Sequence, residues 1–141
     1  MRRLEADLLA AHGLPLPWYD VLLQLAEAPD RRLRMTELAG RVLLSRSGLT
    51  RLVDRLEREG LVERAACPGD ARVTHAVLTE AGLARLREAS PTHLRSIAEH
   101  VTNRLDPHDM DELERLMSKL MPPTVLPEAE CAALEAAEGC P

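Results

Sequence analysis

The chain has 141 residues, of which 45% are hydrophobic and 29% charged, and these proportions are typical of a single soluble globular domain. Its formal net charge is −5, and its only aromatic residues are Trp18 and Tyr19, which counts against modules that stack single-stranded nucleic acid on aromatic side chains. No apolar run approaches the roughly 20 residues of a membrane span, and no signal peptide is evident, so we expect a cytoplasmic protein without a membrane partner.

Two helices and a strand are predicted before the centre of the chain. Residues 2–12 place leucines on one helix face, and Gly13 closes that helix. Prolines keep residues 14–17 extended and lead into a second helix over 18–27. Residues 31–35 are expected to form a short strand that pairs with a later hairpin.

Residues 36–43 and 45–59 are predicted to form two helices joined by a tight turn. Thr36 and Ser45 are the candidate N-caps, because a short side-chain oxygen can accept a hydrogen bond from a free amide of the first turn. Gly60 is expected to end the second helix in a left-handed conformation. The inward face of this helix has the spacing i, i+3, i+4, i+7 and consists of Leu49, Leu52, Val53 and Leu56. Two helices arranged in this way form a helix-turn-helix, whose second helix is the candidate reader of a DNA major groove.

The outward face of the second helix has side chains that suit duplex DNA. Arginine can bridge phosphates or read guanine edges, and hydroxyl groups can contact phosphates or bases. Asp54 and Arg58 lie on the same helix and have the alternative of pairing with their neighbours. The candidate DNA-binding residues are Ser45, Arg46, Ser47, Thr50, Arg51 and Arg55.

A hairpin, or wing, is predicted after Gly60. Residues 61–65 and 74–78 alternate weakly in polarity, and residues 67–70 between them have strong turn chemistry. Arg72 stands just after the tip and is the candidate for a minor-groove contact. Asp70 is expected to accept hydrogen bonds within the wing and so hold Arg72 in place. It is not expected to touch DNA, because its negative charge would repel phosphate.

The distribution of charge answers the objection that an acidic protein is a poor DNA binder. Residues 31–72 hold ten arginines and six acidic residues, a local charge of +4, whereas the rest of the chain carries −9. A basic patch on an acidic body is the electrostatic footprint expected of a local DNA surface.

Two apolar-striped helices are predicted after the wing. Thr79 is expected to cap a helix that reaches about residue 104 and that Ser90-Pro91 kinks or interrupts. Asp106 and Pro107 are expected to begin a further helix. The apolar stripes either complete the core of a monomer or pack against a second copy of the chain.

Three motifs occur together and in order: SGLTRLVDRLEREGLVER at 47–64, Asp-Ala-Arg at 70–72 and Leu-Thr-Glu-Ala-Gly at 78–82. With them the chain resembles the MarR family of bacterial winged helix-turn-helix transcriptional regulators over about residues 14–121. The resemblance implies a mainly α fold with a small β-hairpin wing (α+β). It implies a single MarR-like domain, 1–141, with a DNA-binding lobe at 18–82 and dimerisation helices at 1–13 and 83–121. Residues 122–141 are acidic and are expected to form a C-terminal appendage.

The resemblance also implies a function. The expected protein is a homodimer that binds a pseudo-palindromic double-stranded DNA, acts as a repressor and is released by a small aromatic or phenolic effector. The candidate effector-binding residues are His12, Trp18, Tyr19 and His93. The alternative is that Trp18 and Tyr19 anchor the core. No cofactor is expected.

The cysteines and histidines carry weaker hypotheses. Cys67 lies beside the wing, where a redox switch would act directly on DNA contact, and Arg64 or Arg72 could favour its thiolate. A small buried turn residue is the alternative, since the resemblance places the reactive cysteine of peroxide sensors in the N-terminal helix, where this chain has none. His93 and His100 share a helix face, but no Cys or Glu cluster accompanies them, so no metal site is predicted.

Two other classes of function compete with a DNA-binding regulator. Winged helices can also bind proteins, and an interaction module would show no salt-dependent binding to duplex DNA. An enzyme is not predicted, because no catalytic triad order, Gly-rich phosphate loop or paired-carboxylate site stands out.

Overall fold

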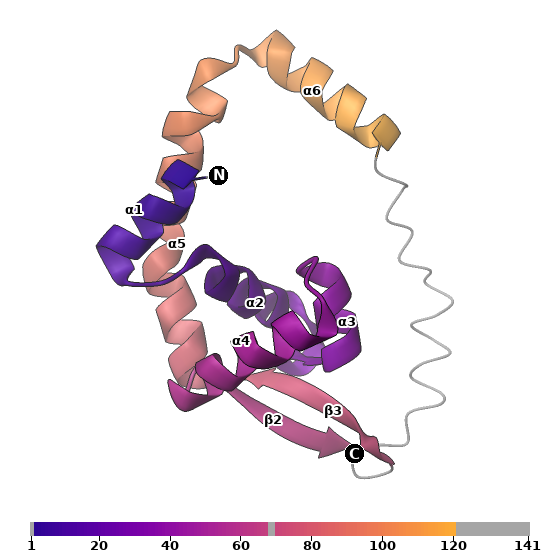
Figure 1. Cartoon of the computed structure of the whole chain (residues 1–141). Helices are drawn as coiled ribbons and strands as arrows, with labels where there is room; N and C mark the ends of the chain where they lie inside the picture. Colours follow the sequence, from indigo (N-terminus) through magenta and orange to yellow (C-terminus); the bar gives the residue numbers. More distant parts are fainter. Residues whose placement is uncertain (1, 68–69, 121–141) are drawn as a thin grey trace. The chain divides into compact units, whose positions relative to one another are not determined.

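The computed structural model describes residues 2–67 and 70–120, with the backbone alone at positions 2 and 70–72. The described residues divide into two compact units, which lie within 1–97 and 98–141. Figure 1 shows the elements, which in chain order are α1 (Arg2–His12), α2 (Leu16–Glu27), η1 (Pro29–Arg31), β1 (Arg32–Arg34), α3 (Met35–Arg41), α4 (Arg46–Arg58), β2 (Val62–Cys67), β3 (Asp70–Leu78), α5 (Glu80–His100), η2 (Thr102–Arg104) and α6 (Pro107–Leu120).

The first unit contains a three-stranded antiparallel sheet in the order β1-β3-β2. Leu33 of β1 and Arg64 of β2 both lie opposite Ala76 of the central strand. The prediction that residues 31–35 pair with the wing is therefore confirmed. Strands β2 and β3 form a long ribbon beside α4 (Figure 1), and each extends further toward the tip than the sequence predicted. The tip itself, residues 68–69, lies outside the described residues.

The helix-turn-helix forms where the sequence predicts it. Ser45 caps α4, since its Oγ accepts a hydrogen bond from the Gly48 amide at 3.1 Å. Gly60 follows the helix with a φ of 71°, as predicted. The prediction that Thr36 caps α3 is wrong, because α3 begins at Met35 directly after β1, and the cap position is occupied by Arg34, which has an extended backbone and makes no side-chain capping hydrogen bond.

A single apolar core fixes the position of α4 within the first unit. Leu49, Val53 and Leu56 are buried as predicted, and Leu52 packs partly buried against the same core. Their partners include Leu22 and Leu25 of α2 and Leu38 of α3, which are fully buried. Burying an aliphatic side chain of this size contributes about 1.5–3 kcal/mol, so this core determines which face of α4 remains in solvent.

Helix α5 begins as predicted but does not break at its proline. Thr79 Oγ1 accepts a hydrogen bond from the Gly82 amide at 3.0 Å, and the helix runs through Pro91 to His100. The sequence predicted a kink or an interruption at Ser90-Pro91, and the interruption is wrong because the helix is continuous there. Side-chain bonds flank the proline, from Tyr19 to Ser90 at 3.2 Å and between His12 and Thr92 at 2.8 Å. These contacts with α1 and α2 hold the helix across the one backbone bond that proline removes.

Helix α6 of the second unit has a well-formed start and no buried residue. The Asp109 amide donates to Asp106 Oδ1 at 2.8 Å, and the Asp106 amide donates to Asp109 Oδ2 at 3.1 Å, so the predicted cap is confirmed. Its exposed apolar residues are Met110, Leu113, Leu116, Met117 and Leu120. Within residues 2–67 and 70–120, no helix has the length and apolar character needed to cross a bilayer.

Candidate nucleic-acid interface

The predicted DNA-binding residues of α4 lie together on its solvent face. Because Leu49, Val53 and Leu56 point into the core, the opposite side of the helix is free. Ser47, Arg51 and Arg55 follow one another at intervals of four residues and therefore share one face. The exposed residues of this set are Ser45, Arg46, Ser47, Thr50, Arg51 and Arg55.

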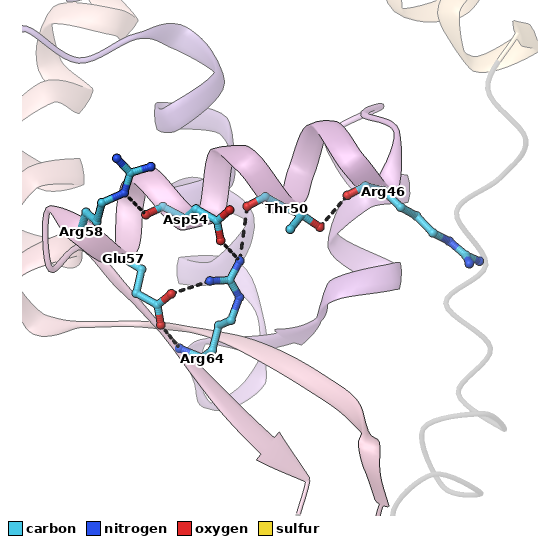
Figure 2. A network of polar contacts seen from close by, with 6 residues as sticks. All are labelled: Arg46, Thr50, Asp54, Glu57, Arg58 and Arg64. Atoms are coloured by element: carbon cyan, nitrogen blue, oxygen red, sulfur yellow. Dashed lines mark hydrogen bonds and ion pairs between the residues drawn. The ribbon is translucent and has the colours of Figure 1, made fainter.

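Three of the arginines on this helix have uncommitted guanidinium groups. Within the described part of the chain, Arg46, Arg51 and Arg55 make no ion pair. Figure 2 shows the side chain of Arg46 extending away from the neighbouring polar network. These guanidinium groups are available to phosphates or base edges without breaking an internal bond.

All three hydroxyl groups predicted to contact DNA make hydrogen bonds within the protein. Thr50 Oγ1 donates its hydrogen bond to the Arg46 carbonyl oxygen at 2.8 Å, as Figure 2 shows. Ser45 Oγ accepts from Gly48, and it lies 3.3 Å from Ser47 Oγ. One of the two serines donates its hydroxyl proton to the other, so the pair keeps one proton that can reach a phosphate, whereas Thr50 must first give up its internal acceptor.

Arg64 of β2 links the wing to α4. The sequence did not predict this link. Its guanidinium donates to Asp54 Oδ1 at 2.6 Å, to the Thr50 carbonyl oxygen at 3.3 Å and to the carboxylate of Glu57 (Figure 2). The Arg64 amide also donates to Glu57 Oε1 at 3.2 Å. Asp54 therefore pairs with a neighbour, as the sequence allowed.

Arg58 also bonds to a neighbour on its own helix, which was the alternative to DNA contact. Arg58 Nε donates to the Asp54 carbonyl oxygen at 3.1 Å (Figure 2). The outward arginines of α4 thus fall into two groups: Arg58 bonds to its own helix, and Arg46, Arg51 and Arg55 face solvent. The side chains of Asp70 and Arg72 lie outside the described residues, so the predicted wing contact stays a prediction.

A cavity of about 410 Å³ lies between α3, α4 and the wing strands. Its lining is polar and basic on the side of Arg64 and Thr50. The lining residues are Arg34, Met35, Thr36, Thr50, Arg64, Val73 and Thr74. None of the four residues predicted to bind an effector lines this cavity.

The structure places three of those four residues, His12, Tyr19 and His93, at residues 90–93 of α5. Tyr19 is buried, its hydroxyl bonds to Ser90, and its ring centroid is 4.5 Å from that of His93. His12 bonds to Thr92, the residue directly before His93. Trp18 is half-buried and packs against the core, in agreement with the alternative that it anchors that core.

Buried polar atoms remain beside this cluster. The Nδ1 atoms of His12 and His93 are both buried without a hydrogen-bond partner in the described part of the chain. The nearest acidic atom to His12 Nδ1 is Glu88 Oε1 at 3.8 Å, which is too long for a hydrogen bond. Desolvation raises the pKa of the neighbouring Asp20 carboxyl, and attraction to His93 offsets part of that rise.

Cys67 ends β2, and its side chain is half-buried. The suggestion that Arg64 favours its thiolate loses support, because the Arg64 guanidinium is engaged by Asp54 and Glu57. Cys131 and Cys140 lie outside the described residues.

Comparison with known proteins places these features in one family. A family model described as MarR family matches residues 12–73. The chain is 34% identical over 106 residues to the HTH-type transcriptional repressor YetL of Bacillus subtilis, covering 75% of this chain and 64% of YetL. It is 30% identical over 129 residues to the transcriptional repressor MprA of Escherichia coli K12, covering 92% of this chain and 73% of MprA. The chain therefore spans less than two thirds of YetL and rather more of MprA.

A solved structure agrees in both fold and sequence. Sco3205, a MarR family transcriptional regulator from Streptomyces coelicolor crystallised in complex with DNA, superposes with a TM-score of 0.79 at 39% identity, covering 84% of this chain and 74% of that chain. The fold predicted from the sequence, a mainly α winged helix-turn-helix with a small antiparallel sheet, is confirmed. Proteins of this kind are regulators and not enzymes. This chain belongs to the MarR family of transcriptional regulators.

Proposed function

We propose that the chain binds duplex DNA through α4 and the wing and represses transcription from the sites it occupies, in the cytoplasm. The observation that carries this proposal is the exposed row of Ser47, Arg51 and Arg55 on a helix whose other face is locked into the core. The DNA complex of Sco3205 and the repressor names of YetL and MprA support it.

The DNA-bound form is a homodimer in this proposal. Helix α6 carries a stripe of Leu113, Leu116, Met117 and Leu120, 42%, 45%, 44% and 78% exposed, and none of its residues is buried. An apolar face of this length needs a covering surface, and a second copy would supply one. Two-fold symmetry would then present two α4 helices to a pseudo-palindromic site.

The effector in this proposal is a small aromatic or phenolic molecule bound beside His12, Trp18, Tyr19 and His93. The two buried Nδ1 atoms support a polar ligand there, because buried polar atoms rarely go without a partner. Effector binding would favour a dimer whose DNA lobes are wrongly spaced for the site. A thermal-shift screen of phenols and aromatic acids, repeated with His93→Ala, tests this: selective loss of the shift supports the site, and equal shifts reject it.

Titrating the purified protein into its own upstream DNA over a salt series tests the main function. A dimer should bind each site, and affinity should fall steeply with salt as phosphate counterions are released. Arg51→Ala should weaken binding by about 10-fold. The exposed Arg87→Ala of α5 is the matched control for loss of one charge. If affinity for specific and random duplexes is equally weak and independent of salt, the winged helix instead serves a protein partner.

A further inference from the structure

The turn of the helix-turn-helix contains a leucine in a backbone conformation that normally belongs to glycine. Leu43 has a φ of 53°. Its amide bonds to the Gly40 carbonyl at 3.4 Å, and the Leu44 amide bonds to the Ala39 carbonyl at 3.1 Å. These two bonds define a Schellman C-cap, in which the residue after the cap is left-handed. A side chain at such a position is strained, because its Cβ crowds the backbone.

Two other helices of the chain end in the expected way. Helix α4 closes with the same pair of bonds, from Gly60 to Glu57 at 2.9 Å and from Leu61 to Leu56 at 2.9 Å, and Gly60 has a φ of 71°. Helix α1 ends at Gly13, with a φ of 61°. The cap that precedes α4 therefore differs from these two in having a large side chain where they have glycine.

The Leu43 side chain contributes nothing to the core of the described unit. It is 92% exposed, more than any other large apolar residue of the described chain, whereas its neighbour Leu44 packs against the core. Packing of Leu44 therefore stabilises the folded state, whereas the strained backbone at Leu43 destabilises it. Backbone strain that packing does not repay points to a role outside the folded monomer.

The position of Leu43 identifies the partner. It precedes the N-cap Ser45 by two residues, at the end of α4 that enters a major groove in helix-turn-helix proteins. The neighbouring exposed side chains are Ser45, Arg46 and Ser47, which are polar or basic. A protein partner would need a larger apolar patch, but a DNA surface that is mostly polar offers single apolar sites, such as a thymine methyl group or a deoxyribose.

We propose that Leu43 contacts DNA through its apolar side chain, at the leading edge of the reading helix. This inference rests on the proposed function. It assigns a binding role to the turn itself and explains why the turn tolerates a strained leucine.

Three variants separate this role from a structural one, measured by anisotropy on the duplex that the wild-type protein selects from a random library. Leu43→Gly should raise the melting temperature by about 2–4 °C, because strain is removed, while weakening binding about 3- to 10-fold. Leu43→Ala keeps the strain and should weaken binding equally without that rise. Leu43→Met keeps an apolar side chain and should bind within about 2-fold of the wild type. The salt slope should not change in any variant, since no phosphate contact is lost.

The outcomes are distinct. If Leu43→Gly and Leu43→Ala bind like the wild type, the inference is wrong although the proposed function stands. If the wild type selects no duplex, both fail. Replacing each thymine in turn by deoxyuridine identifies the contact: loss of affinity for the wild type but not for Leu43→Ala indicates a methyl group. Weak binding by Leu43→Ala without any such thymine indicates a deoxyribose.

Discussion

Arg64 Nη2 lies 2.6 Å from Asp54 Oδ1, and this ion pair joins the first strand of the wing to the middle of the reading helix. The Arg64 side chain is 25% exposed and also bonds to Glu57, so one planar guanidinium bridges two carboxylates of α4. Arginine suits this geometry because its donors are fixed in a fork. This bridge, together with the short loop that connects α4 to β2, holds the wing and α4 in one orientation.

Replacing Arg64 by alanine should loosen that connection. We expect Arg64→Ala to lower the free energy of unfolding by about 1–2 kcal/mol, since charge-assisted bonds are lost but the carboxylates remain partly solvated. Urea denaturation at fixed protein concentration measures the loss, and hydrogen exchange in β2 and β3 should become faster. The loss should be smaller at high salt.

Arg58→Ala is the control for Arg64→Ala, because it removes the same charge from the same surface. Among the described residues, Arg58 bonds to the Asp54 backbone alone, so its loss should cost less than about 0.5 kcal/mol. Equal effects of the two variants would mean that the bridge from Arg64 to α4 does not stabilise the wing.

Gly82 in the first turn of α5 should not tolerate a side chain. A Cβ at this position would lie 2.1 Å from the Leu61 carbonyl oxygen and 2.7 Å from Leu78 Cδ1. Because the nearest atom belongs to the backbone, it cannot swing away. We expect Gly82→Ala to destabilise the protein by about 2–4 kcal/mol.

The same substitution at Gly40 in α3 is the control, because there we expect no loss of stability. A Cβ there would meet nothing within 4 Å, so Gly40→Ala should be neutral or stabilise the protein by up to about 1 kcal/mol through helix propensity. Chemical denaturation of the two variants side by side measures both. A Gly82→Ala protein as stable as Gly40→Ala would contradict the close packing of α5 on Leu61.

The wing prediction for Arg72 rests on the sequence and can be tested directly. Arg72→Ala should weaken binding to all duplexes by a similar factor, because a minor-groove or phosphate contact of this kind carries little sequence information. The slope of log affinity against log salt should fall by about 1. An unchanged slope together with unchanged affinity would reject Arg72 as a DNA contact.

The raised pKa of Asp20 predicts a pH dependence of stability. The folded chain holds this proton more tightly than the unfolded chain, because desolvation disfavours the carboxylate. Stability linked to Asp20 is therefore highest at acidic pH and falls as the pH rises through the folded pKa. Asp20→Asn should raise the melting temperature at pH 7, and the gain should shrink toward pH 4. A gain of equal size at both pH values would show that titration of Asp20 is not its cause.

Local chemistry was enough to predict the elements that present the interface. Ser45 and Gly60 have side-chain and backbone properties that suit a helix start and a helix end, and both act as expected. The pairing of residues 31–35 with the wing also followed from pattern and position. The family resemblance then predicted that these elements assemble into a winged helix-turn-helix.

Two of the features that the sequence analysis did not predict depend on contacts between different elements. Pro91 lies within α5 because Tyr19 and His12 bond to residues on either side of it, and no local pattern contains that information. The Arg64 bridge depends on the register of β2 beside α4, ten residues away from Asp54. The left-handed conformation of Leu43 runs against the preference of its own residue type, so no local pattern predicts it.

Selection of duplexes from a random library by the purified wild-type protein, followed by sequencing, tests the central claim that α4 reads DNA. We expect enrichment of a pseudo-palindrome whose half-sites lie on one face of the duplex, about 10–10.5 base pairs apart or a multiple of this. Arg51→Ala should enrich the same site with one relaxed position in each half. If the wild type enriches no sequence, or if Arg51→Ala and Arg55→Ala both enrich the unchanged site, α4 is not the reading helix.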